Sequence, residues 1–108
     1  MNKQDEPSNE ALQLAYTSLQ DSNFDYIVSD DIIQEQILER VVELLTKNPE
    51  RLMSILYKID VQEQRINDVM KNTPIGGIAQ HITNLILERM QEKVETRNKY
   101  RSQQQNDA

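Results

Sequence analysis

Apolar side chains recur three and four positions apart through most of this chain of 108 residues. That spacing gathers side chains on one face of an α-helix, whereas a half-buried β-strand would need strict alternation. Only two glycines and three prolines interrupt the pattern. The spacing is clearest toward the middle of the chain, at Ile33, Ile37, Val41 and Leu44. The sequence therefore predicts an all-α domain.

Capping residues and prolines divide this pattern into separate helices. Asn48 can cap a helix over about 49–59, because the Pro49 that follows it suits the first helical position. Thr73 and Pro74 repeat this arrangement before a last helix that we expect to reach about residue 100. Two earlier helices are expected, over about 8–19 and from Ser29 or Asp30 to Asn48.

The segment 61–71 has two interpretations. Asp60 followed by Glu63 resembles a capping box, with Asp where Ser or Thr is usual, and would start a fresh helix there. The alternative is a bent continuation of the helix over 49–59. In either case the expected fold is a small bundle of four to five helices, with a long C-terminal helix and disordered ends.

Both ends of the chain are polar. Residues 1–7 and 101–108 hold almost no apolar side chains, so we expect flexible tails around a single helical domain over 8–100. The chain has no cysteine, no apolar run long enough to span a bilayer and no basic-then-apolar secretory signal. We therefore expect a cytoplasmic protein that does not enter a membrane.

The net charge of −6 is unevenly distributed. Residues 1–39 hold nine acidic side chains against one lysine, whereas residues 89–101 hold five bases against two acids. An acidic chain repels phosphate backbones, so nucleic-acid binding is not the expected role. The bases are a candidate contact for an acidic partner: Arg89, Lys93, Arg97, Lys99 and Arg101. A solvated helix end is the alternative, since such bases also complement the helix dipole.

The apolar stripe of the last helix is longer than one small bundle would cover. We expect its later part to stay partly exposed and to contact a protein partner, most simply a second copy in a homodimer. The candidate interface consists of Ile86, Leu87, Met90, Val94 and Tyr100.

The stretch T-P-I-G-G-I-A-Q-H, from Thr73 to His81, lacks the lysine and preceding strand of a phosphate-binding loop. It also lacks the glycine spacing of a dinucleotide fingerprint. We interpret Gly76 and Gly77 as small residues that let another backbone approach closely. The alternative is a weak anion site at the helix N-terminus, near His81. One histidine without cysteine does not make a zinc site, so neither a metal nor a cofactor is expected.

Asp21, Asn23 and Asp25 match the first three ligand positions of an EF-hand calcium loop. The match then fails at the sixth position, Tyr26, where glycine makes the turn. It fails again at the twelfth position, Ile32, where a bidentate glutamate belongs. We expect an acidic connector here.

The sequence contains no recognisable catalytic constellation, so we do not expect an enzyme. We hypothesise a small non-catalytic protein–protein interaction or regulatory module that self-associates through its C-terminal helix. The alternative is a DNA-binding regulator with a helix-turn-helix over 49–71, whose second helix would present Gln62, Gln64 and Arg65 to base edges. The acidic Glu63 and Asp68 on that helix count against it. A small-molecule enzyme ranks last.

Overall fold

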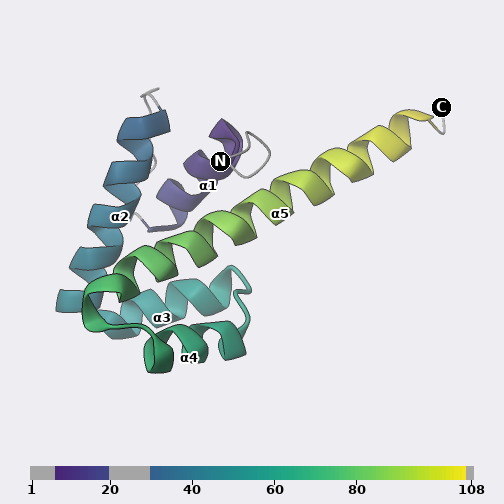
Figure 1. The fold of residues 1–108 in the computed structure, drawn as a ribbon. Coiled ribbons are helices and arrows are strands. Elements are labelled where there is room, and N and C mark those ends of the chain that lie inside the picture. Colours follow the sequence, from purple (N-terminus) through teal and green to yellow (C-terminus); the bar gives the residue numbers. More distant parts are fainter. Residues whose placement is uncertain (1–6, 20–29, 107–108) are drawn as a thin grey trace.

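The computed structural model of the chain describes residues 7–19 and 30–106, with side chains as far as Arg101. Helices make up almost all of these residues (Figure 1). In chain order they are α1 (Asn9–Leu19), α2 (Asp30–Lys47), α3 (Pro49–Lys58), α4 (Glu63–Asn72), the short 3₁₀ turn η2 (Ile75–Gly77) and α5 (Ile78–Asn106). The predicted all-α bundle with a long C-terminal helix is confirmed.

Helix α1 docks on the bundle, between α2 and α5. It starts where Ser8 caps it: the Ser8 hydroxyl accepts a hydrogen bond from the Ala11 N–H at 3.2 Å. Its apolar stripe is fully buried and consists of Ala11, Leu12, Ala15 and Leu19. Burying one leucine stabilises the fold by about 2 kcal/mol. The two alanines let the neighbouring helices come close, so a short and weakly apolar helix still closes the core.

The second and third helices follow the sequence prediction closely. The Asn48 side chain accepts a hydrogen bond from the Arg51 N–H at 3.2 Å, and Pro49 takes the first helical position. Helix α3 packs mainly on α2, with a smaller contact to α1. The side chains that α2 and α3 bury are Ile33, Ile37, Val41, Leu44, Leu52 and Leu56.

Asp60 ends α3 rather than starting α4, so the predicted capping box is wrong. Its backbone adopts φ 67°, the left-handed conformation. The Val61 N–H bonds to the Leu56 carbonyl at 3.0 Å, and the Asp60 N–H bonds to the Tyr57 carbonyl at 3.1 Å. This is a Schellman motif with Asp in the usual glycine position, sealed by burial of Val61 and Leu56. Helix α4 is thus a separate helix and not a bent continuation; it starts after Gln62, which makes no side-chain cap.

Two arginines stabilise helix ends from neighbouring helices. The Arg40 Nε on α2 donates to the carbonyl of Leu19, the last residue of α1, at 3.0 Å. The Arg89 Nε on α5 donates to the Ile59 carbonyl, just past α3, also at 3.0 Å. Carbonyls at a helix C-terminus lack intrahelical partners and carry the negative end of the dipole. Each guanidinium therefore links two helices, and its positive charge lies at the negative end of a helix dipole, where it is favourable.

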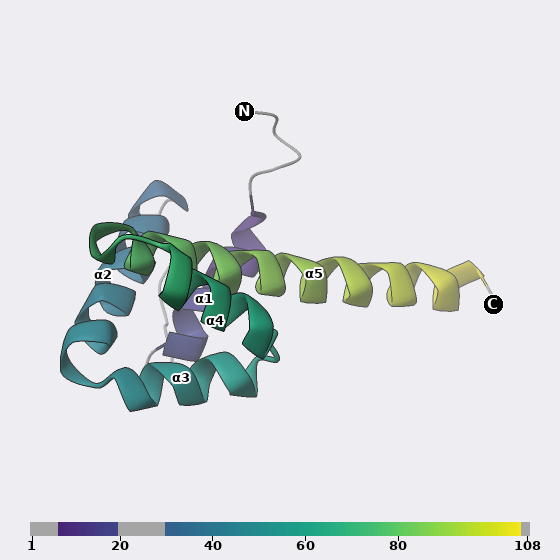
Figure 2. The same cartoon turned by 60° about the horizontal axis from the view of Figure 1, so that its bottom comes forward.

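Helix α5 begins later and ends later than the sequence indicated. Thr73 caps the end of α4, and Pro74 leads into η2, so α5 starts at Ile78 rather than at the proline. At the other end it continues to Asn106, through most of the segment expected to be a flexible tail. Figures 1 and 2 both show its last turns running clear of the bundle.

The expectation that the later apolar stripe of α5 stays exposed is wrong for three of its members. Ile86 is fully buried, Met90 is 4% exposed and Val94 is 3% exposed. Helix α1 packs against α5, and two polar contacts join them. The Ser8 N–H donates to Gln91 Oε1 at 2.8 Å, and Arg97 pairs with Glu10. The surplus apolar surface is thus used within the chain itself.

Several expectations fall outside the described residues: the Ser29 cap, the N-terminal tail over 1–6 and the acidic connector over 21–29, which holds the first EF-hand positions. Within the described ranges, no helix combines the length and the apolarity needed to cross a bilayer.

Replacing Asp60 with glycine should raise the free energy of unfolding by about 0.5–1 kcal/mol, because glycine adopts a positive φ without steric cost. The side chain that is lost is 74% exposed and lies 3.9 Å from Arg89, so its charge contributes little. Thermal and urea unfolding, followed by circular dichroism, measure the change.

The matched control is Asp60→Val, which places a β-branched residue at the same positive φ and should lower the stability by about 1–2 kcal/mol. A glycine variant that unfolds more readily than the parent chain would show that the Asp60 side chain is itself needed.

Candidate interaction surface

The part of α5 beyond Val94 is a helix that the rest of the described chain does not cover. Every side chain from Glu95 to Arg101 is exposed. We call residues 95–106 the arm; at 1.5 Å per residue it is about 18 Å long. Its helical form costs little, because the arm extends a helix already nucleated in the bundle and is rich in strong helix formers. Figure 2 shows the arm projecting into solvent.

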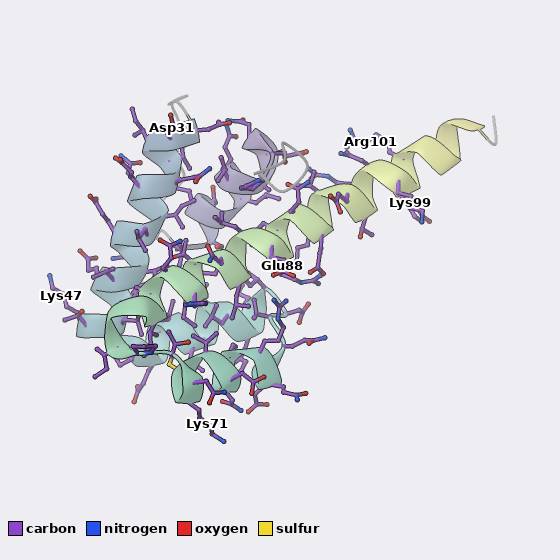
Figure 3. The ribbon with its side chains drawn as sticks, viewed as in Figure 1. Asp31, Lys47, Lys71, Glu88, Lys99 and Arg101 are labelled. Carbon is purple, nitrogen blue, oxygen red and sulfur yellow. The ribbon has the colours of Figure 1, made fainter. Side chains whose placement is uncertain are left out.

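Bases spaced four residues apart form one face of α5 that leads from the bundle onto the arm. Each step of four residues rotates by about 40° around the helix, so four such bases lie within about 120°. Together with Thr96 and Tyr100 they line one open hollow along the helix. We call this the basic face; its charged members are Arg89, Lys93, Arg97 and Arg101. Lys99 lies on the opposite side of the helix: Figure 3 shows the side chains of Lys99 and Arg101 on two different sides of α5.

The bases of this face differ in how far the fold already uses them. Arg89 binds the Ile59 carbonyl and lies 3.3 Å from Glu92, so it is a structural residue. Arg97 pairs with Glu10 of α1 while remaining about half exposed. Within the described residues, Lys93 and Arg101 make no ion pair. The charges available to a partner are therefore those of Lys93, Arg101 and part of Arg97.

Only part of the predicted apolar interface remains available. Tyr100 is 64% exposed and lies on the basic face, between charged side chains. Leu87 is half-buried and packs against the core. The other three predicted members are buried within the bundle, as described above. Tyr100 is thus the one residue of that set positioned to contact another molecule.

Helix α2 carries a second surface that the sequence analysis missed. Four exposed acids follow one another at intervals of four residues: Asp31, Glu35, Glu39 and Glu43. Ile32 and Val42 lie on the same side of the helix, and each is 46% exposed. We call these six residues the acidic face. Glu43 pairs with Arg40, whereas the first three acids make no ion pair within the described residues. Their regular spacing is visible in the sequence and could have revealed this face.

The glycine pair does not serve close packing between helices. A Cβ at Gly76 would meet nothing within 4 Å, and neither glycine has a positive φ. A Cβ at Gly77 would lie 3.2 Å from the Thr73 side chain, which belongs to the same turn. The close-packing interpretation is therefore wrong, because the pair lies in an exposed 3₁₀ turn and no second helix backbone approaches it. His81 is exposed on the first turns of α5.

Helices α3 and α4 pack on different neighbours. Helix α3 lies on α2 and α1, whereas α4 lies on α5 and fully buries only Ile66. Arg65, the base best suited to read a nucleic acid, is bound to Glu88 of α5 through both carboxylate oxygens, at 3.2 and 2.7 Å. These two hydrogen bonds hold the pKa of Glu88 below its usual value and raise that of Arg65. The pair joins α4 to α5, although both side chains stay about half exposed.

A polar hollow of about 300 Å³ lies between the α3–α4 connection and α5. Asp60 and Glu92 line it together with Arg65 and Arg89, so opposite charges balance one another. In the part of the chain that the structure describes, no three His, Asp or Glu side chains gather as metal ligands.

Comparisons with protein-family models, curated proteins and solved structures find no match to this chain. The functional argument therefore rests on the two charged faces.

Replacing Gly76 with alanine should raise the free energy of unfolding by about 0.4–1 kcal/mol, since alanine restricts the unfolded chain and the site has room for a Cβ. Gly77→Ala is the matched control and should gain less, because its Cβ would crowd Thr73. Urea unfolding measures both. A loss of stability at Gly76 would restore the close-packing interpretation.

Glu88→Gln should lower the stability at neutral pH by about 0.5 kcal/mol, the usual scale for an exposed ion pair. Because the pKa of Glu88 is held low in the fold, its ionised form stabilises the protein above the ordinary glutamate pKa of about 4.3. That stabilisation is lost as the pH falls through the lower, folded-state pKa.

The difference between Glu88→Gln and the parent chain should therefore shrink toward zero in acid, as measured by urea unfolding at a series of pH values. Asp68→Asn, at an exposed acid without an ion pair among the described residues, is the control and should show no such trend. A constant difference at all pH values would contradict the assignment.

Proposed function

We propose that this protein is a small non-catalytic interaction module that binds an acidic protein partner through the basic face of α5. The observation that carries the proposal is the arm, a helical extension whose side chains leave the core after Val94. Its side chains from Glu95 to Arg101 are exposed, so most of this charged helical surface is available to another molecule.

The composition of the basic face suits a protein partner. Lys93 and Arg101 line the same hollow of α5 as Tyr100. Arginine and tyrosine are enriched where proteins contact one another, since both combine apolar area with hydrogen-bonding groups. The positive charge would speed the encounter with an acidic surface.

The charge of the whole chain disfavours nucleic acid as that partner. The net charge is −6, and the acidic face of α2 belongs to the same small domain. The affinity of a protein for a phosphate backbone grows with the number of lysine and arginine side chains that contact it. Only a few such side chains are available here. An acidic protein surface asks for a smaller and more local positive patch.

Charge reversal on the basic face tests this function. Lys93→Glu with Arg101→Glu should abolish the capture of partner proteins from the native cell extract, read by quantitative mass spectrometry after nuclease treatment. The control variant, Lys71→Glu with Lys99→Glu, reverses two charges away from this face and should still capture the same partner proteins. Circular dichroism verifies that both double variants stay folded.

Recovery of the same proteins by both double variants would refute the proposal. So would partners that disappear when the extract is treated with nuclease, because the bound species would then be a nucleic acid.

A further inference from the structure

The basic face of α5 and the acidic face of α2 have the same repeat. The bases are spaced four residues apart from Arg89 to Arg101, and the acids are spaced four residues apart from Asp31 to Glu43. Each row is therefore about 18 Å long, with charges about 6 Å apart. Each face also carries exposed apolar side chains, Tyr100 on one and Ile32 and Val42 on the other. Their charges and their spacing are complementary.

These two faces do not meet within one molecule. Asp31 lies in the first turn of α2, and Arg101 lies far along the arm on the other side of the bundle (Figure 3). Figures 1 and 2 both place α2 and the end of α5 at opposite sides of the fold. A contact between the faces must therefore join two copies of the chain.

We propose that the basic face of one copy, from Lys93 to Arg101, docks along the acidic face of α2 in a second copy. The inference deepens the proposed function, on which it rests, because it names the acidic partner as this chain itself. It replaces the predicted homodimer through Ile86, Met90 and Val94, which the fold already buries.

The side chains least engaged in the fold carry this contact. Lys93 and Arg101 are without ion pairs in the described chain, and so are Asp31, Glu35 and Glu39. Opposed across an interface, they neutralise one another. Tyr100 brings apolar area to the row of bases, and the half-exposed aliphatic side chains of α2 receive it. Burial of these apolar groups adds a contribution that salt does not screen.

The contact joins two different surfaces of the chain. Two copies that dock on each other reciprocally form a closed dimer, whereas copies that each contact two neighbours form a head-to-tail assembly. In both cases association should depend on concentration. Exposed charges dominate the contact, so it should weaken strongly as salt is added.

Sedimentation velocity of the full chain over a range of concentrations tests the inference. We expect the apparent dissociation constant to rise at least about tenfold when NaCl is raised from about 50 to about 500 mM. Two reversals should each give a monomer: Lys93→Glu with Arg101→Glu, and Glu35→Lys with Glu39→Lys. The Lys71→Glu and Lys99→Glu control should associate like the parent chain.

Mixing the two reversed variants gives the decisive result. The second variant keeps the basic face of α5 and the first keeps the acidic face of α2, so the mixture should associate although neither variant does alone. If a reversed variant fails to fold, the neutral pair Glu35→Gln with Glu39→Gln replaces the α2 reversal and should weaken association.

Three outcomes would overturn the inference: a parent chain that stays monomeric at low salt, association that both reversals leave unchanged, and a mixture that remains monomeric. A monomeric parent chain that still captures an acidic protein through its basic face would leave the proposed function intact and refute self-docking alone. A parent chain that stays monomeric and also captures no acidic protein would refute both the self-docking and the proposed function.

Discussion

The packing of α1 against α5 is the contact on which the rest of the structure depends. Helix α1 is short and would not persist alone in water, yet it buries its whole apolar stripe and lies over the part of α5 that holds Met90 and Val94. The Ser8–Gln91 hydrogen bond and the Glu10–Arg97 ion pair fix the position of the start of α1 along α5. Without it, α5 would present a long apolar stripe to solvent. With it, the core ends at Val94.

That boundary divides α5 into two parts with different physical roles. Up to Val94 the helix is an internal strut, contacted by α1, α2 and α4. Beyond Val94 it is a solvated arm whose helical form is inherited from the strut. The bases follow the same division: Arg89 caps the end of α3, whereas Arg101 makes no ion pair with the described chain. One row of bases therefore begins as scaffold and ends as free surface.

Much of the fold could be read from local chemistry. The apolar periodicity, the Asn48 cap and Pro49 placed the first three described helices almost to the residue. The wrong helix boundaries were predicted where the same residue type can either start a helix or end one. Asp60 has the side chain of an N-cap, but the left-handed backbone that closes α3 uses the same residue as a C-terminal stop. Thr73 and Pro74 likewise end one helix and open a 3₁₀ turn, a choice that depends on the path between two packed helices.

The sequence by itself determined which segments coil, where most of them end and how unevenly the charge is distributed, because these depend on neighbours a few residues away. Only the tertiary structure decided which apolar side chains are left over. Ile86 and Val94 look as available as Tyr100 in the sequence, but the packing of the bundle buries the first two and leaves the third exposed. It also decided that α2 and the end of α5 lie at opposite sides of the fold, since the relative orientation of the two helices is set by long-range packing.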